Sequence, residues 1–183
     1  MDGAFLPGYN RFPMNDFPRV AVSGPAGTVS MVWNDTRYHP LGDILLQSFT
    51  LGSLAPVQTT PVVVNPAADA SNFLPALRVA NSKGKLDVSW YSRTDANSAV
   101  TGVTAVIGVN PRTTATPGAD TTITSATSDW DNDSSDIVPN FGDYTDNALV
   151  TTATAPYVGS TLYVAWSDGR LGLPQPFEAH VAG

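Results

Sequence analysis

The chain has 183 residues, a formal net charge of −7 and no cysteine. Its seven arginines and two lysines are scattered along the sequence, so we expect neither a nucleic acid nor an anionic membrane surface as a partner. The absence of cysteine excludes disulfides, thiolate catalysis and zinc-thiolate sites. Abundant Gly, Pro, Thr, Val and Ser, with no sustained helical period, predict an all-β fold in one domain spanning residues 1–183.

An irregular, aromatic lead-in over residues 1–16 precedes the first predicted strand. Strands are expected at residues 17–23, 28–33 and 44–49, separated by a Gly-Pro-Ala-Gly turn and by the polar turn Asn34–Arg37. Alternation places Val29, Met31 and Trp33 on one face of the second strand, which we expect to be a core face. Strand, turn, strand, loop and strand predict an antiparallel meander.

The pattern restarts with a short apolar strand at residues 59–65. The segment Leu74–Val79 repeats the character of Phe17–Val20, and Leu86, Val88 and Trp90 repeat the placement of Val29, Met31 and Trp33. Residues 100–109 are expected to form the outer strand of this second unit. The unit therefore predicts a second sheet built like the first.

The least regular part of the chain covers residues 110–140, with a short edge strand expected near residues 121–124. Further strands are predicted at residues 148–153, 161–166 and 177–181. The segment Thr161–Arg170 is the clearest copy of a unit in which a tryptophan ends an apolar strand and an arginine follows in a polar turn. Its spacing from the copies at Trp33 and Trp90 fits propeller blades of roughly 40–50 residues with loop insertions.

Four segments carry a resemblance to a known family: Pro18–Ser23, Met31–Arg37 followed by Gly42-Asp43-Ile44, Phe141–Asp146 and Val164–Arg170. They resemble bacterial sialidase-like propeller proteins with BNR-type repeats. The Asp-box Ser-x-Asp-x-Gly-x-x-Trp and the Arg-Ile-Pro motif of that family are not intact here. The resemblance implies about three four-stranded antiparallel blades, roughly at 17–58, 59–125 and 126–183, in an incomplete ring.

Such a partial ring implies that the chain is the C-terminal portion of a longer protein, or that another subunit completes it. The resemblance also implies a secreted or cell-surface bacterial protein, although the sequence holds no signal peptide of its own.

The arginines Arg37, Arg93 and Arg170 occupy corresponding positions of the repeat. In the sialidase family an arginine triad clamps the substrate carboxylate, so the resemblance implies that role for them. The alternative is that each arginine braces its own turn against Asp35, Asp95 or Asp168. Repetition favours this alternative, because a repeated residue usually serves every blade alike.

Sialidases use a tyrosine nucleophile with a glutamate partner. Glu178 is the only glutamate of the chain, and Tyr163 or Tyr144 would be the nucleophile that the resemblance implies. The alternative is that Glu178 lies, with His180, on a solvated strand face.

Two polar clusters are further candidates. The alternating carboxylates of Asp129, Asp131, Asp133 and Asp136 are typical of a loop that binds Ca²⁺, although an acidic, solvated loop explains them as well. Asp143, Tyr144 and Asp146 could bind a sugar or form a local turn. Trp130 lies in the irregular region, so we expect it to be exposed and available to a ligand, whereas the other three tryptophans should be core residues.

Three functions follow from these patterns. The first is an extracellular, non-catalytic propeller segment that presents loops to a glycan or protein. The second is an exo-sialidase-type glycoside hydrolase that is active only within a longer chain. The third is a structural subunit that assembles through open sheet edges.

Overall fold

The computed structural model describes residue 8 and residues 17–66, 71–80, 83–95, 97–131, 145–151 and 160–182. These residues form strands and turns, with no helix among them, so the predicted all-β class is confirmed. The strands are β1 Arg19–Ser23, β2 Thr28–Asp35, β3 Asp43–Thr50, β4 Val62–Val63, β5 Ser71–Val79, β6 Leu86–Arg93, β7 Val100–Val109, β8 Thr121–Thr122, β9 Ser128–Asp129, β10 Asp146–Thr151, β11 Ser160–Asp168 and β12 Gln175–Ala182.

The strands pair into three antiparallel sheets that follow chain order. The first sheet has the order β1-β2-β3-β4, the second β5-β6-β7-β8 with β9 also paired to β7, and the third β10-β11-β12. Each of these sheets is a meander, because strands that follow one another along the chain are hydrogen-bonded neighbours. The arrangement is consistent with consecutive blades of an incomplete propeller.

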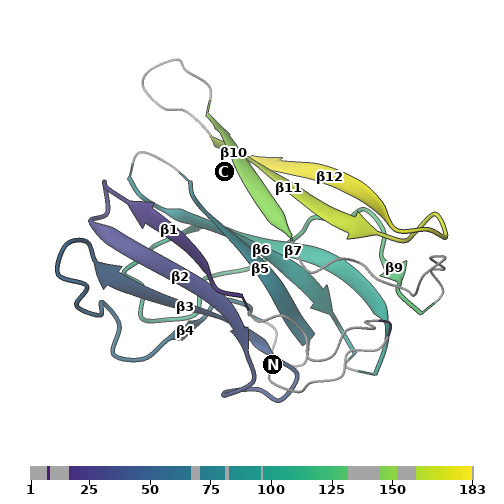
Figure 1. The fold of residues 1–183 in the computed structure, drawn as a ribbon, viewed down its shortest axis with the longest axis horizontal. Coiled ribbons are helices and arrows are strands. Elements are labelled where there is room, and N and C mark those ends of the chain that lie inside the picture. The colour runs from purple at the N-terminus through teal and green to yellow at the C-terminus, as the bar shows by residue number, and fades with distance from the viewer. Residues whose placement is uncertain are drawn as a thin grey trace.

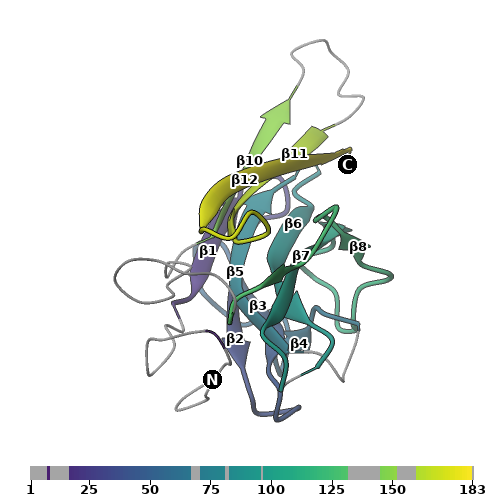
Figure 2. The same cartoon turned by 90° about the vertical axis from the view of Figure 1, so that its right-hand side faces the viewer.

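The sheets are stacked face to face, with the second sheet in the middle (Figure 1). One apolar core fills the space between the first and second sheets and includes Val32, Leu46, Val88 and Trp90. Another core lies between the second and third sheets and includes Tyr91, Val103, Leu162 and Trp166. Figure 2 shows the third sheet lying across one side of this stack. The second sheet is therefore buried on both faces, whereas the outer face of the third sheet is exposed at Ala165, Glu178 and His180.

The first strand of each sheet lies on the same side of the stack. Strand β5 contacts both β1 and β10, as the innermost strands of neighbouring blades do. Leu74 joins all three sheets at this point: its N–H donates to Asn34 Oδ1 (3.2 Å), and its carbonyl accepts from Thr145 Oγ1 (2.6 Å). Pro75 has no N–H to give to a ladder, and the pairing of β5 with β6 is interrupted between Phe73 and Ala76.

The turns at the end of the first hairpins pack closely as well. Gly84 has a φ of +76°, and a Cβ built there would collide with Ser23 and Ala26. Ser23 Oγ lies within hydrogen-bond reach of the Gly84 carbonyl (3.4 Å) and accepts from the Ala26 N–H (3.2 Å). A glycine is needed here because the turn of the second sheet presses on the turn of the first.

The structure differs from the sequence-based expectation in two elements of the first sheet. The strand expected at residues 59–65 pairs with β3 as β4, so it ends the first sheet and does not start the second. In β2 the residues that face the second sheet are Thr28, Ser30, Val32 and Asn34, whereas Val29, Met31 and Trp33 lie on the open side and are only half-buried. The expected core face of β2 was therefore wrong.

Polar residues are tolerated on the buried side of β2 because their hydrogen bonds are largely made. Ser30 Oγ and Ser48 Oγ lie 2.8 Å apart across β2 and β3, and Asn34 accepts from Leu74 as described above. Among the described residues there is no helix long and apolar enough to cross a membrane. The aromatic lead-in over residues 1–16 lies outside the described residues except for Gly8.

Candidate functional site

Two of the three candidate arginines close a short Trp-x-Asp-x-Arg turn. At the end of β2, Trp33 Nε1 and Arg37 Nε both donate to Asp35 Oδ2, at 3.0 and 2.8 Å. The Arg37 N–H donates to Asp35 Oδ1 (2.8 Å), and the guanidinium lies over the indole ring. Partial burial would raise the pKa of Asp35, but the hydrogen bonds from Arg37 and Trp33 outweigh it and bring this pKa to about 2.

The same turn recurs at the end of β11. Trp166 Nε1 donates to Asp168 Oδ2 (2.8 Å), and Arg170 binds both carboxylate oxygens, the closer at 2.6 Å. Burial opposes ionisation of Asp168, yet the hydrogen bonds from Arg170 and Trp166 lower its pKa. Arg170 also donates to Ser125 Oγ and to the Ala126 carbonyl, both at 2.9 Å. The guanidinium donors of Arg170 are thus engaged within the protein, as the bracing alternative predicts.

Arg93 does not belong to this pattern. Arg93 is 1% exposed, and its guanidinium lies between the rings of Phe73 and Trp130. The Arg93 Cζ atom is 5.3 Å from the Phe73 ring centroid and 5.0 Å from the Trp130 ring centroid. It donates to Thr101 Oγ1 and to the Ser98 carbonyl, and not to Asp95. Desolvation lowers the pKa of Arg93 to about 10. The expectation that Arg93 binds substrate, or braces its turn against Asp95, was wrong.

Trp130 is a core residue and not an exposed ligand platform. Its exposed fraction is 0%, and its ring packs edge-on against Phe73 and Tyr91. Gly8, with a φ of +70°, lies so close that a Cβ there would collide with Trp130. Trp130 does not belong to an alternating strand pattern, so the local sequence did not predict its burial. Contacts with Phe73 and Tyr91, which are distant in the sequence, bury it.

These placements separate the three arginines. Arg37 ends a strand of the first sheet, Arg93 is in the core between the second and third sheets, and Arg170 follows a strand of the third sheet. Each is engaged by its own surroundings, and no hollow described here brings them together. The triad that the resemblance implies is therefore not assembled.

The catalytic candidates Tyr163 and Glu178 do share one surface. In the third sheet Ala165 pairs with Glu178 and Tyr163 pairs with His180, so all four side chains lie on the open face. The Tyr163 ring packs against the His180 ring, with centroids 5.4 Å apart. Tyr163 and Glu178 are diagonal neighbours on adjacent strands, a separation of roughly 7–8 Å between backbones. Both line a hollow of about 190 Å³.

Two further charged residues line this hollow. Arg78 reaches it from β5 and donates to Asp146 Oδ1 of β10 at 2.7 Å. Asn147, buried beside them, donates to Ser89 Oγ (3.0 Å), while its Oδ1 has no hydrogen-bond partner. The Asn147 side chain is on the inner side of the sheet, so the hollow brings together one guanidinium, two carboxylates and a phenol from four strands.

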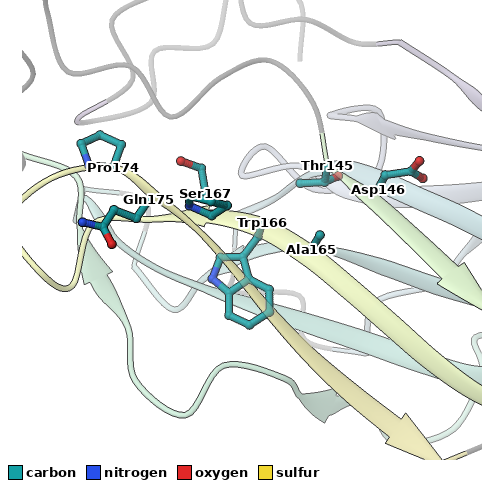
Figure 3. Close-up of a pocket in the computed structure, with 8 residues that line it drawn as sticks. Thr145, Asp146, Ala165, Trp166, Ser167, Pro174 and Gln175 are labelled. Carbon is teal, nitrogen blue, oxygen red and sulfur yellow. The ribbon is translucent and has the colours of Figure 1, made fainter.

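A second hollow of about 390 Å³ adjoins the first and shares Asp146 and Ala165 with it. It extends toward the β11–β12 turn, where Ser167, Pro174 and Gln175 line it (Figure 3). Figure 3 shows the side chains of Ser167 and Trp166 on opposite sides of their strand, which leaves the indole in the core. We call the two hollows together the furrow.

Sequence reasoning did not single out Arg19 and Arg78 as site residues. Arg19 donates to the Thr145 carbonyl (3.1 Å) and Arg78 to the Asp146 carboxylate, so both first strands reach the start of β10. The available signal was the repetition of Phe17–Val20 by Leu74–Val79, which contain these two arginines. Asp146 itself was predicted, and it lies at the centre of the furrow.

The acidic loop is described only in part. Asp129 Oδ1 accepts from the Asp131 N–H (3.2 Å), and the positive charge of Arg93 lies near both carboxyl groups. Asp133, Asp136, Asp143 and Tyr144 lie outside the described residues. Within the described part of the chain, no three carboxylate or histidine groups are placed to hold a metal ion. The calcium site stays a prediction.

Comparisons with known proteins do not assign this chain to a family. No family model and no curated protein matches its sequence. A solved structure, that of an N-acetylgalactosamine deacetylase from F. plautii in complex with blood group B trisaccharide, matches with a TM-score of 0.46 and 10% identity. The match covers 92% of this chain and 49% of the other, so this chain spans about half the length of that protein. The sialidase-type assignment stays a prediction.

Proposed function

We propose that the chain is an extracellular, non-catalytic glycan-binding module and that the glycan lies in the furrow. The observation that carries this proposal is the convergence of Arg78, Asp146, Tyr163 and Glu178 on one hollow of the open face. The carboxylates accept hydrogen bonds from sugar hydroxyls, and the guanidinium donates to ring or hydroxyl oxygens. The half-buried Tyr163 ring offers an apolar face to the C–H groups of a pyranose.

The dimensions of the furrow suit a short saccharide. The inner hollow of about 190 Å³ is smaller than the roughly 300–1,000 Å³ of sites for drug-sized ligands, so it suits one sugar ring. The outer hollow of about 390 Å³ continues from it across Asp146 and Ala165, where a second and third sugar can follow. The proline and glutamine lining of the outer hollow supplies apolar contact and an amide for hydrogen bonding.

The non-catalytic part of the proposal rests on the state of the arginines. Arg78 is paired with Asp146, while Arg37 and Arg170 are paired within their own turns. An ion-paired arginine has less to offer a substrate carboxylate, since binding would exchange one carboxylate for another. A neutral glycan does not require that exchange.

A glycan array probed with the full chain, followed by titration calorimetry on the best glycan, tests the proposal. Tyr163→Ala and Glu178→Gln should each weaken binding by about tenfold, as residues at the centre of a binding site do. Tyr38→Ala and Asp120→Asn change an exposed tyrosine and an exposed aspartate away from the furrow and serve as matched controls. Binding that the furrow variants leave intact, or no binding to any glycan at millimolar concentration, would contradict the proposal.

The second candidate is a sialidase-type glycoside hydrolase. One observation favours it: Tyr163 and Glu178, the residues that the resemblance assigns to catalysis, line the same hollow. This candidate predicts release of the fluorophore from a fluorogenic sialoside, and loss of that turnover in Tyr163→Phe, which retains the ring but lacks the nucleophilic hydroxyl. Glycan binding with no turnover would rule out the hydrolase and leave the binding module.

A further inference from the structure

One row across the outer face of the third sheet holds two carboxylates with a methyl group between them. Asp146 of β10 pairs with Ala165 of β11, and Ala165 pairs with Glu178 of β12. Figure 3 shows Asp146 and Ala165 on neighbouring strands, and all three residues line the inner hollow of the furrow. The backbones of β10 and β12 lie roughly 9–10 Å apart, which is two strand spacings. A group that rests on Ala165 therefore has a carboxylate on either side.

The charges of this row are not balanced within the protein. Arg78 donates to Oδ1 of Asp146 (2.7 Å), and the next backbone N–H donates to the same oxygen (2.9 Å), so Oδ2 of Asp146 stays open. Glu178 has no hydrogen bond or ion pair in the part of the chain that the structure describes. The neighbouring His180 ring packs on the Tyr163 ring instead. The hollow thus holds one guanidinium against two carboxylates, an excess of one negative charge.

A protonated amine complements these groups. An ammonium group has three N–H donors and no acceptor, and the row offers Oδ2 of Asp146 and both oxygens of Glu178. Hydrogen bonds between an ammonium and a carboxylate are about twice as strong as neutral ones. Tyr163 lies two residues from Ala165 on the same side of β11, and the face of its ring attracts a cation. A hydroxyl group would use the same acceptors but would leave the charge of Glu178 unbalanced.

A divalent metal ion fits this row less well than an ammonium group. Ca²⁺ takes six to eight oxygen ligands, and among the described residues no third carboxylate or histidine joins Asp146 and Glu178. The guanidinium of Arg78 lines the same hollow and repels a dication. An amine needs only the acceptors already present, and it leaves the pair of Arg78 and Asp146 in place.

We propose that the glycan of the furrow is an amino sugar whose protonated amine lies over Ala165, between Asp146 and Glu178. This assignment rests on the proposed glycan-binding function and adds the class of sugar. The Tyr163 ring packs against the C–H groups of the amino sugar, and the outer hollow receives the sugars that follow. N-acetylation removes the positive charge, so the hollow favours the free amine over its N-acetylated form.

Titration calorimetry of the full chain tests this assignment with trisaccharides of glucosamine and of galactosamine, each beside its N-acetylated counterpart. At mildly acidic pH we expect one of the amine-bearing sugars to bind at least about tenfold more tightly than its counterpart. Glu178→Gln keeps the shape of the side chain without its charge, so it should remove this preference. Tyr163→Ala should weaken binding of both forms, and Asp120→Asn, an exposed carboxylate away from the furrow, should change neither. Added sodium chloride should weaken binding of the amine-bearing sugar only.

The outcomes separate this assignment from the proposed function. Equal affinity for the two forms, with loss of both in Tyr163→Ala, overturns the amino-sugar assignment and leaves the glycan-binding function. A preference that Glu178→Gln leaves intact also overturns the assignment. If no sugar binds in a way that the furrow variants change, both proposals fail. Trilysine offers ammonium groups without a sugar ring: trilysine binding as tight as that of the amino sugar overturns the assignment, and weaker binding supports it.

Discussion

At the end of β2, a tryptophan, an aspartate and an arginine within five residues make a closed set of hydrogen bonds. Asp35 receives the indole N–H, the Arg37 backbone N–H and the guanidinium, so its carboxylate is held in the ionised form. The repetition of this set at Trp166, Asp168 and Arg170 shows that the tryptophan has a second task besides packing. It fixes the carboxylate that orients the following arginine.

Acid should weaken the protein through Asp35. Its folded-state pKa of about 2 lies below the ordinary value of an aspartate, 3.8, so the stabilisation is present above pH 4 and is lost as the pH falls through 2. Arg37 is half exposed, and solvent screening limits the contribution to about 1 kcal/mol. Asp35→Asn should lose this amount at pH 7, and its stability should then fall less than that of the wild type between pH 4 and 2, as measured by urea denaturation.

The matched variant Asp120→Asn, which removes an exposed carboxylate, should follow the wild-type curve at pH 7. If Asp35→Asn and the wild type lost equal stability between pH 4 and 2, the ion pair would contribute nothing to the pH dependence.

Arg93 is held differently from Arg37 and Arg170, because it is buried and makes no ion pair with an aspartate of its own turn. It is buried between Phe73 and Trp130, where the ring faces stabilise the cation and the surrounding desolvation lowers its pKa to about 10. The guanidinium is still charged at neutral pH. The same sequence pattern therefore gave different environments. Arg37 and Arg170 find their partners within their own turns, whereas the rings beside Arg93 come from β5 and from the segment that follows β9.

At the scale of elements, side chains that bridge neighbouring sheets hold the stack together. The clearest is Tyr91 of β6, whose hydroxyl accepts from the Ser167 N–H (2.9 Å) and donates to the Ser167 carbonyl (3.2 Å) of β11. Burial raises the pKa of Tyr91, so the phenol stays protonated and can donate. Arg19 and Thr145 make similar links between first strands.

Tyr91→Phe should destabilise the protein by about 1–3 kcal/mol, because it leaves the Ser167 N–H and carbonyl without their partner while the ring packing is kept. Urea denaturation at pH 7 measures this change. Tyr38→Phe removes a hydroxyl from a tyrosine that is 45% exposed and should have little effect. Equal stability of the two variants would mean that water replaces the bridge without loss.

For the whole molecule, the stack of three sheets has two ends with different chemistry. The open face of the third sheet carries the furrow with its charged and hydroxyl groups, whereas on the outer side of the first sheet Leu45 and Gln47 are buried and Val20 and Val22 are exposed. Val22→Glu should leave glycan affinity unchanged, because Val22 does not line the furrow.

Much of the fold could be predicted from the sequence because its signals are local. Alternation and turn residues placed most of the strands, including the edge strand β8 Thr121–Thr122, within a few residues of their bounds, whereas β9 Ser128–Asp129 was not predicted. The pairing of Arg37 with Asp35 and of Arg170 with Asp168 was likewise foreseen, since a turn of five residues brings its own partners together. Tyr163 and Glu178, which were predicted as a pair, line the same hollow, whereas no local signal joined them to Asp146, predicted as part of another cluster, or to Arg78.

Contacts between distant segments decided the rest. Period-two alternation shows that β2 has two faces but not which one meets another sheet, and the second sheet covers the side of Val32 and Asn34 instead of that of Trp33. Trp130 and Arg93 became core residues because Phe73 and Tyr91 lie beside them across many residues of sequence. The sequence by itself determined the strands, their turns and the repeat, whereas burial and the furrow depended on which sheets the stack brings into contact.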